Sequence, residues 1–315
     1  MKAVVCALVL MNAALIPLRG NIAPALCGIA VSDEIVQITP IQVLTDELKN
    51  QAGFVQVHAA EALLQLQHPA DVPTEFHKAE VAFGERPQIR MGIWRVLALA
   101  ADSPSDQAKW RQKIVDAFLD VDGPDRIHAV ESLAKLKYRI PDSQKHAFTE
   151  AARSTDSGLA IYARWALAVN EDATQETQIS SLLSSADPIE RLRAAYILQR
   201  LDSVSPDTVA AILKAAETEP AESSAYAYIV SAAAIVSRRS GAAEVFDHWH
   251  GVLTELSAKS SDATQRATAC HTLAETGSAP DAELLRHRLR DENPDVRISA
   301  AYALEKIARR TRTPQ

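Results

Sequence analysis

The stretch from Asn293 to Leu304 reads NPDVRISAAYAL and decides the fold. It opens with an asparagine–proline turn and then places arginine between large apolar residues, followed by paired small residues and a closing leucine. This spacing is typical of a helix with one packed face. Consecutive alanines favour a helix and leave room for a neighbour to approach closely. The stretch therefore predicts a helix that lies tightly between other helices.

The same skeleton recurs upstream at a regular period. Its closing apolar residue, which we call the anchor, falls at Leu63, Leu97, Leu133, Leu167, Leu198, Ile235, Leu273 and Leu304. Consecutive anchors are 31–38 residues apart, and a further helical segment precedes each skeleton. A fixed period of this length indicates stacked helix pairs. We expect about eight pairs over residues 38–309, forming one continuous α-solenoid rather than the two domains that the length alone suggests.

Composition supports an all-α protein. The 315 residues include 55 alanines but only 10 glycines, and 5% are aromatic. A barrel or a sandwich needs more β-branched and aromatic residues and more glycine turns. The net charge of −7 offers no basic surface for nucleic acid, so we expect no nucleic-acid partner.

The repeated skeleton, clearest in Pro294–Leu304, resembles the HEAT family of repeats and in particular its short bacterial type, named after phycobilisome lyases. The resemblance implies a right-handed solenoid, and it implies a module that binds other molecules more often than an enzyme. Val57–Leu63 together with Ile89–Leu97 also resembles a group of exported bacterial HEAT-repeat proteins. That likeness implies a shared patch: His58, Glu61, Arg90, Trp94 and Arg95.

The first thirty residues are typical of a secretory signal peptide. Lys2 precedes the apolar run Ala3–Leu18, and small residues suited to cleavage follow near Ala25 and Ala30. An N-terminal helix packed on the solenoid is the alternative. We expect residues 1–30 to be removed, the protein to be periplasmic or extracellular, and residues 310–315 to form a tail. No later apolar run is long enough to cross a membrane.

Two sets of positions within the skeleton carry polar residues. Seven residues before the anchor, arginine predominates, and we expect it to bond turn carbonyls or acids of the neighbouring repeat. Five and two residues before the anchor, side chains share one helix face and should line the concave surface. With the adjoining Arg90 and Trp94, the candidate binding residues are His58, Glu61, Arg95, His128, Glu131, Tyr162, Trp165, Arg193 and Tyr196.

These residues favour a non-enzymatic interaction module that binds a protein, a peptide or a glycan on its concave face. The alternative is an enzyme or a small-ligand protein in repeats one to three, with His58 or His128 as general base and Arg90 or Arg95 holding an anionic group. His58 with Glu61, and His128 with Glu131, stand at i and i+3 and could each bind a metal from one helix face. A histidine–glutamate hydrogen bond explains the same spacing, so we predict no cofactor.

Overall fold

The computed structural model describes residues 38–69 and 71–312, and its helices form one compact unit. Within these residues there are sixteen α-helices and no strand. The helices are α1 (Pro40–Asn50), α2 (Phe54–Gln65), α3 (Val72–Phe83), α4 (Pro87–Ala100), α5 (Pro104–Leu119), α6 (Arg126–Lys135), α7 (Asp142–Ala151), α8 (Ser157–Ala168), α9 (Ala173–Ser181), α10 (Pro188–Leu198), α11 (Pro206–Thr218), α12 (Tyr226–Ser240), α13 (Ala243–Lys259), α14 (Ala263–Thr276), α15 (Ala282–Arg288) and α16 (Pro294–Arg312). Short 3₁₀ turns occupy Leu182–Ser184 and Ala279–Asp281. The expected signal peptide lies outside the described residues.

Local sequence explains where many of these helices begin. The Ser103 hydroxyl accepts a hydrogen bond from the amide of Asp106, and the Asp156 carboxylate accepts from two amides of α8. These side chains satisfy amides that have no partner within the helix. Proline stands at the first turn of several helices, as Pro188 does in α10, where it has no amide to leave unpaired.

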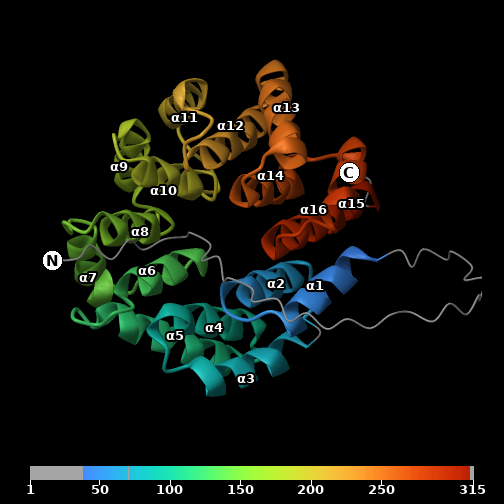
Figure 1. Cartoon of the computed structure of the whole chain (residues 1–315). Helices are drawn as coiled ribbons and strands as arrows, with labels where there is room; N and C mark the ends of the chain where they lie inside the picture. The colour runs from blue at the N-terminus through green and yellow to red at the C-terminus, as the bar shows by residue number, and fades with distance from the viewer. Residues whose placement is uncertain (1–37, 70, 313–315) are drawn as a thin grey trace, which may run out of the picture. The chain divides into compact units, whose positions relative to one another are not determined.

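The helices alternate between two layers. The second helix of each pair lies on the inside and the first on the outside, as α9 and α10, or α11 and α12, show in Figure 1. We call α2, α4, α6, α8, α10, α12, α14 and α16 the inner helices. This arrangement confirms the all-α solenoid of eight helix pairs.

Alanine marks the tightest packing positions on the inner helices. Ala59-Ala60, Ala194-Ala195 and Ala300-Ala301 are all fully buried. Larger side chains fill the spaces between layers, and the rings of Phe118 and Phe148 pack with centroids 4.3 Å apart. The alanine pairs predicted from the repeat therefore allow each inner helix to approach its neighbours.

The arginine seven residues before the anchor joins successive repeats. Arg266 binds Asp291 of the next repeat through two hydrogen bonds of 2.8 and 2.9 Å, and Arg191 binds Glu219 in the same way. Both arginines also donate to carbonyls of the turn that precedes their own helix. The structural role predicted for this column is confirmed.

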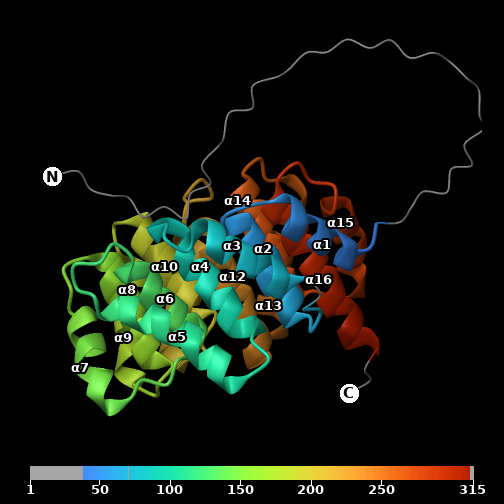
Figure 2. The ribbon, with the colours of Figure 1, turned by 90° about the horizontal axis from the view of Figure 1, so that it is seen from below.

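The last repeat packs against the first. Figures 1 and 2 both place α16 beside α1 and α2. Arg297 of α16 donates to Glu47 of α1 at 2.6 Å, repeating across this joint the contact that Arg266 makes within the chain. Asp295 lies 2.8 Å from the ring of His58, and the Tyr302 hydroxyl donates to Gln65 at 2.7 Å. The described helices thus close into a ring, whereas the sequence led us to expect an open concave groove.

The C-terminal helix also extends further than expected. It runs to Arg312, although a tail was predicted from residue 310. Arg309 donates to the carbonyl of Leu66, and Arg310 donates to that of Gly277. Cationic side chains are favourable beside the carbonyl end of a helix, and these bonds hold the last turn in place.

Candidate functional site

The residues two positions before each anchor meet at one level inside the ring. We call them the central belt: Glu61, Arg95, Glu131, Trp165, Tyr196, Ala233, His271 and Tyr302. Only His271 is exposed and Glu61 is half-buried, while the other six are buried. The sequence correctly predicted that these positions share a face, but the expectation that their large side chains are exposed was wrong. Side chains of the same and adjacent inner helices cover them.

Two ion pairs lie in repeats one to three of the belt. Arg95 donates to Glu61 at 2.5 Å and to the hydroxyl of Ser132 at 2.8 Å. Lys135, one turn after Glu131, lies 2.9 Å from its carboxylate. Burial by itself would raise the pKa of both glutamates, but the cations outweigh burial and lower both values. Both carboxylates are therefore ionised at neutral pH.

An aromatic ladder continues the belt through repeats four to six. The ring centroid of Trp165 lies 6.5 Å from that of Tyr162 and 5.8 Å from that of Tyr196. Tyr196 in turn lies 6.2 Å from Tyr228. Edge-to-face contacts of this kind stabilise aromatic pairs beyond the area they bury.

Cationic side chains cover the ladder. The guanidinium of Arg200 lies 3.6 Å from the ring centroid of Tyr196, and the ammonium group of Lys135 lies 5.6 Å from it. Both are cation–π distances. The sequence interpretation missed Lys135 and Arg200 because it stopped at the anchor. Each follows a belt residue by four positions, Glu131 and Tyr196 respectively, and this spacing could have revealed them.

Inner helices that are not adjacent in the ring influence one another. His271 of α14 stacks on Tyr302 with ring centroids 5.4 Å apart. Desolvation inside the ring disfavours the charged form of the imidazole. The positive charges of Arg200 and His58 add to this effect. Together they lower the pKa of His271 to about 4, so its ring is neutral at pH 7.

The structure places the two histidine–glutamate pairs differently. The Nδ1 atom of His58 bonds Asp295 of α16, while Glu61 binds Arg95. His128 lies 3.8 Å from Glu131, whose carboxylate also pairs with Lys135. Among residues 38–69 and 71–312, no group of three or more histidine, cysteine or acidic side chains could hold a metal ion.

Arg90 and Trp94 do not join the belt. Arg90 forms an ion pair with Asp125, in the turn before α6, and its guanidinium lies 5.5 Å from the ring of Trp94. Trp94 is 9% exposed and packs beneath Lys113 of the outer helix α5. The patch implied by the likeness to exported bacterial HEAT-repeat proteins is therefore divided. Arg90 and Trp94 lie at a joint between repeats, whereas Glu61 and Arg95 lie inside the ring. In this structure Arg90 bonds Asp125 and Arg95 bonds Glu61, so each arginine already has a carboxylate partner.

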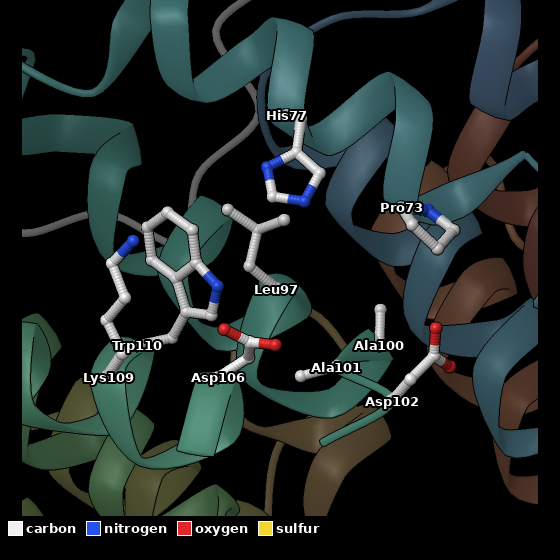
Figure 3. A pocket seen from close by; sticks show the side chains of 9 residues that line it. All are labelled: Pro73, His77, Leu97, Ala100, Ala101, Asp102, Asp106, Lys109 and Trp110. Atoms are coloured by element: carbon white, nitrogen blue, oxygen red, sulfur yellow. The ribbon is translucent and has the colours of Figure 1, made fainter. Parts of the chain in front are cut away.

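A separate pocket of about 230 Å³ opens between α3, α5 and the end of α4. Figure 3 shows its lining: Pro73, His77, Leu97, Ala100, Ala101, Asp102, Asp106, Lys109 and Trp110. The imidazole of His77 lies 6.0 Å from the indole of Trp110. None of these residues was a sequence candidate, because the pocket arises between outer helices, where the repeat skeleton has no polar column.

A known family of repeats matches the C-terminal part of the chain. Residues 251–314 match the family described as HEAT repeats. A solved structure of human deoxyhypusine hydroxylase in complex with glycerol is similar over 86% of this chain and 96% of that chain, with 13% sequence identity and a TM-score of 0.41. No curated protein matches the chain.

The described helices form an α-solenoid, and residues 251–314 at its C-terminal end match HEAT repeats. None of the described helices has the length and apolar character needed to cross a membrane.

Proposed function

We propose that this protein is an exported interaction module, not an enzyme, and that it binds a peptide segment of a partner protein on its inner helices. The aromatic ladder and its cationic cover carry the proposal. Close packing of a solenoid needs only apolar and small residues on its inner helices, such as Val230 and Ala233. The large polar and aromatic side chains of the belt and the ladder supply the chemistry of recognition.

Access to the inner helices supports binding of a narrow ligand. The ring brings side chains of inner helices two repeats apart within electrostatic reach of one another, so an extended segment suits the site better than a folded domain. His271 of the belt is nonetheless exposed, and other exposed side chains border the belt on several inner helices: His58, Gln65, Leu99 and Glu275. A peptide would meet these residues before it reaches the ladder.

Photo-cross-linking in the producing cells tests the binding surface. A photoreactive amino acid would replace His271 on inner helix α14 or, as a control, Val81 on outer helix α3, which is 86% exposed. We expect partner adducts from position 271 and none from position 81, with peptides identified by mass spectrometry. Adducts from position 81 alone would place the partner on the outer helices and contradict the proposal.

Export rests on the pattern of residues 1–30 and has its own test. We expect the protein from fractionated cells to lie outside the inner membrane and to begin after Ala25 or Ala30. A control chain with Lys2 retained but charged residues placed within Ala3–Leu18 should stay uncleaved inside the cell. A mature protein that begins at Met1 in the cytoplasmic fraction would refute export.

A further inference from the structure

The pocket between α3, α5 and the end of α4 contains a buried donor that the protein itself does not use. Trp110 is 7% exposed, and no described atom accepts a hydrogen bond from its indole N–H. The indole nitrogens of Trp94 and Trp165 are sealed from solvent, whereas that of Trp110 is not. Figure 3 shows the nitrogen of Trp110 turned toward the space between His77 and Asp106. A ligand in the pocket can therefore reach this donor.

Two carboxylates line the same pocket, and neither pairs with a cation among residues 38–69 and 71–312. Asp106 accepts a hydrogen bond from the hydroxyl of Ser103 at 2.7 Å, and Asp102 forms no hydrogen bond within the described part of the chain. Lys109 also lines the pocket, but its ammonium lies 5.3 Å from the ring centroid of Trp110, on the other side of the indole from Asp106 in Figure 3. Negative charge in the pocket is therefore left for a ligand to balance.

Cationic side chains of α5 lie against the ring of Trp110. The ammonium groups of Lys109 and Lys113 lie 5.3 and 4.8 Å from its centroid, and Glu80 holds the second of them in an ion pair of 2.8 Å. Both are cation–π distances. These lysines compete with any ligand for the faces of the ring, as a stacked sugar would require. The nitrogen edge is therefore the part of the indole that the pocket offers.

The other walls of the pocket are apolar and leave room for a small molecule. Pro73, Leu97 and Ala100 line them, and the pocket has a volume of about 230 Å³. Drug-sized ligands occupy about 300–1,000 Å³, so a smaller molecule suits this space. Asp106 and Trp110 stand at i and i+4 on one face of α5, so that such a molecule can reach both side chains.

We propose that this pocket binds a small amine whose ammonium group stands next to a neutral carbonyl, as in an amino acid amide. The ammonium donates to Asp106, and the carbonyl oxygen accepts from the indole N–H of Trp110. A hydrogen bond between two charged groups is stronger than one between neutral groups, so the ammonium contributes most to affinity. Asp102 and Asp106 would repel a carboxylate in place of the carbonyl. This site goes beyond the peptide binding proposed for the inner helices, and neither proposal depends on the other.

Nuclear magnetic resonance titration provides the test. The chain has four tryptophans, so the indole ¹H–¹⁵N region is simple, and a Trp110→Phe variant assigns the relevant signal. The probe is alaninamide. Lactamide replaces its ammonium by a hydroxyl, and 2-aminobutane replaces its amide by an ethyl group. We expect alaninamide to shift the Trp110 signal, lactamide to bind at least about tenfold more weakly, and 2-aminobutane to bind about two- to tenfold more weakly.

Protein variants complete the design. Asp106→Asn should weaken alaninamide at least about tenfold and leave lactamide unchanged, because only the ammonium needs the charge. Trp110→Phe should remove the advantage of alaninamide over 2-aminobutane, measured from backbone amides of α5, because phenylalanine has no N–H. Asp116→Asn makes the same charge change on an exposed side chain of α5 and should leave binding unchanged. The spectrum of each variant shows whether it remains folded, and Asp106→Asn decides the outcome if Trp110→Phe does not fold.

Several results would overturn the inference. An unmoved Trp110 signal at the solubility limit of alaninamide would exclude the site, and equal binding of lactamide would remove the role of charge. Equal binding of 2-aminobutane would remove the role of the indole donor. Tighter binding of methyl glucoside or of trialaninamide than of alaninamide would make the occupant a sugar or the N-terminus of a polypeptide. None of these results changes the cross-links expected at position 271, so the two proposals can fail separately.

Discussion

Replacing Arg297 by alanine should open the ring at the joint between repeats eight and one. Arg297 donates to Glu47 at 2.6 Å and to the carbonyls of Asp291 and Glu292 at 2.7 and 3.0 Å. No peptide bond connects these two repeats across the joint, so side-chain and packing contacts alone hold it closed.

The expected cost follows from burial of the pair. The side chains of Arg297 and Glu47 are 22% and 9% exposed. Removing one partner of a fully buried pair costs about 3–5 kcal/mol, whereas an exposed pair contributes at most about 1 kcal/mol. At intermediate burial we expect a loss of about 2–4 kcal/mol, because Glu47 keeps a desolvated charge without its partner. That loss raises the population of the open joint by roughly 30- to 1000-fold.

Hydrogen exchange with mass spectrometry should report the opening. In Arg297→Ala, amides of α1, α2 and α16 should exchange faster, and small-angle scattering should show a larger maximum dimension. Arg266→Ala is the matched control, because Arg266 makes the same contacts at a joint that the chain itself bridges. It should lower stability without loosening α1. The double variant Glu47→Arg with Arg297→Glu should restore part of the protection.

Unchanged exchange in α1 and α2 of Arg297→Ala would refute the reasoning. So would equal loosening of these helices in Arg266→Ala, because it would mean that the joint has no separate role in closure.

Three further predictions concern Arg95 and His271 inside the ring and Cys270 between the two helix layers. Arg95→Met should lower the free energy of unfolding, measured by chemical denaturation, by about 3 kcal/mol, because Glu61 loses its partner. Adding Glu61→Gln should recover at least half of that loss. A further loss in the double variant would contradict this. The lowered pKa of His271 means that between pH 6.5 and about 4 the unfolded chain binds a proton that the folded chain does not. Stability should therefore fall with pH across that window, and the drop in melting temperature from pH 7 to pH 5 should be smaller in His271→Gln; an equal drop would exclude the effect. Burial raises the pKa of Cys270 to about 11, so its thiol should react with a disulfide reagent at pH 8 only after unfolding. Mass spectrometry maps the modified residue. Rapid reaction of Cys270 in the folded protein would contradict this prediction.

Most of the fold follows from the sequence because each repeat is a local structure. The period located every inner helix, and the arginine column fixed how one repeat joins the next. Arg266 and Asp291 lie only 25 residues apart, within the range that a repeat pattern covers.

Closure could not be predicted in the same way. It depends on the small rotation between successive repeats, summed over the whole array, and no single residue encodes that sum. His58 and Asp295 are separated by 237 residues, so nothing in either repeat indicates that they meet. Burial of Trp165 and Tyr196 has a different cause: side chains of repeats three to six cover them, and each repeat taken alone does not show this.

Closure also makes the number of repeats a fixed quantity. Open arrays can gain or lose a repeat by duplication or deletion, because each end faces solvent whatever the length. Here each repeat turns the chain through about one-eighth of a circle, and the last must meet the first. A seven- or nine-repeat descendant would leave Glu47 and Arg297 out of register. Change in this protein is therefore confined to substitution within repeats, and its inner side chains can diversify while its repeat count cannot.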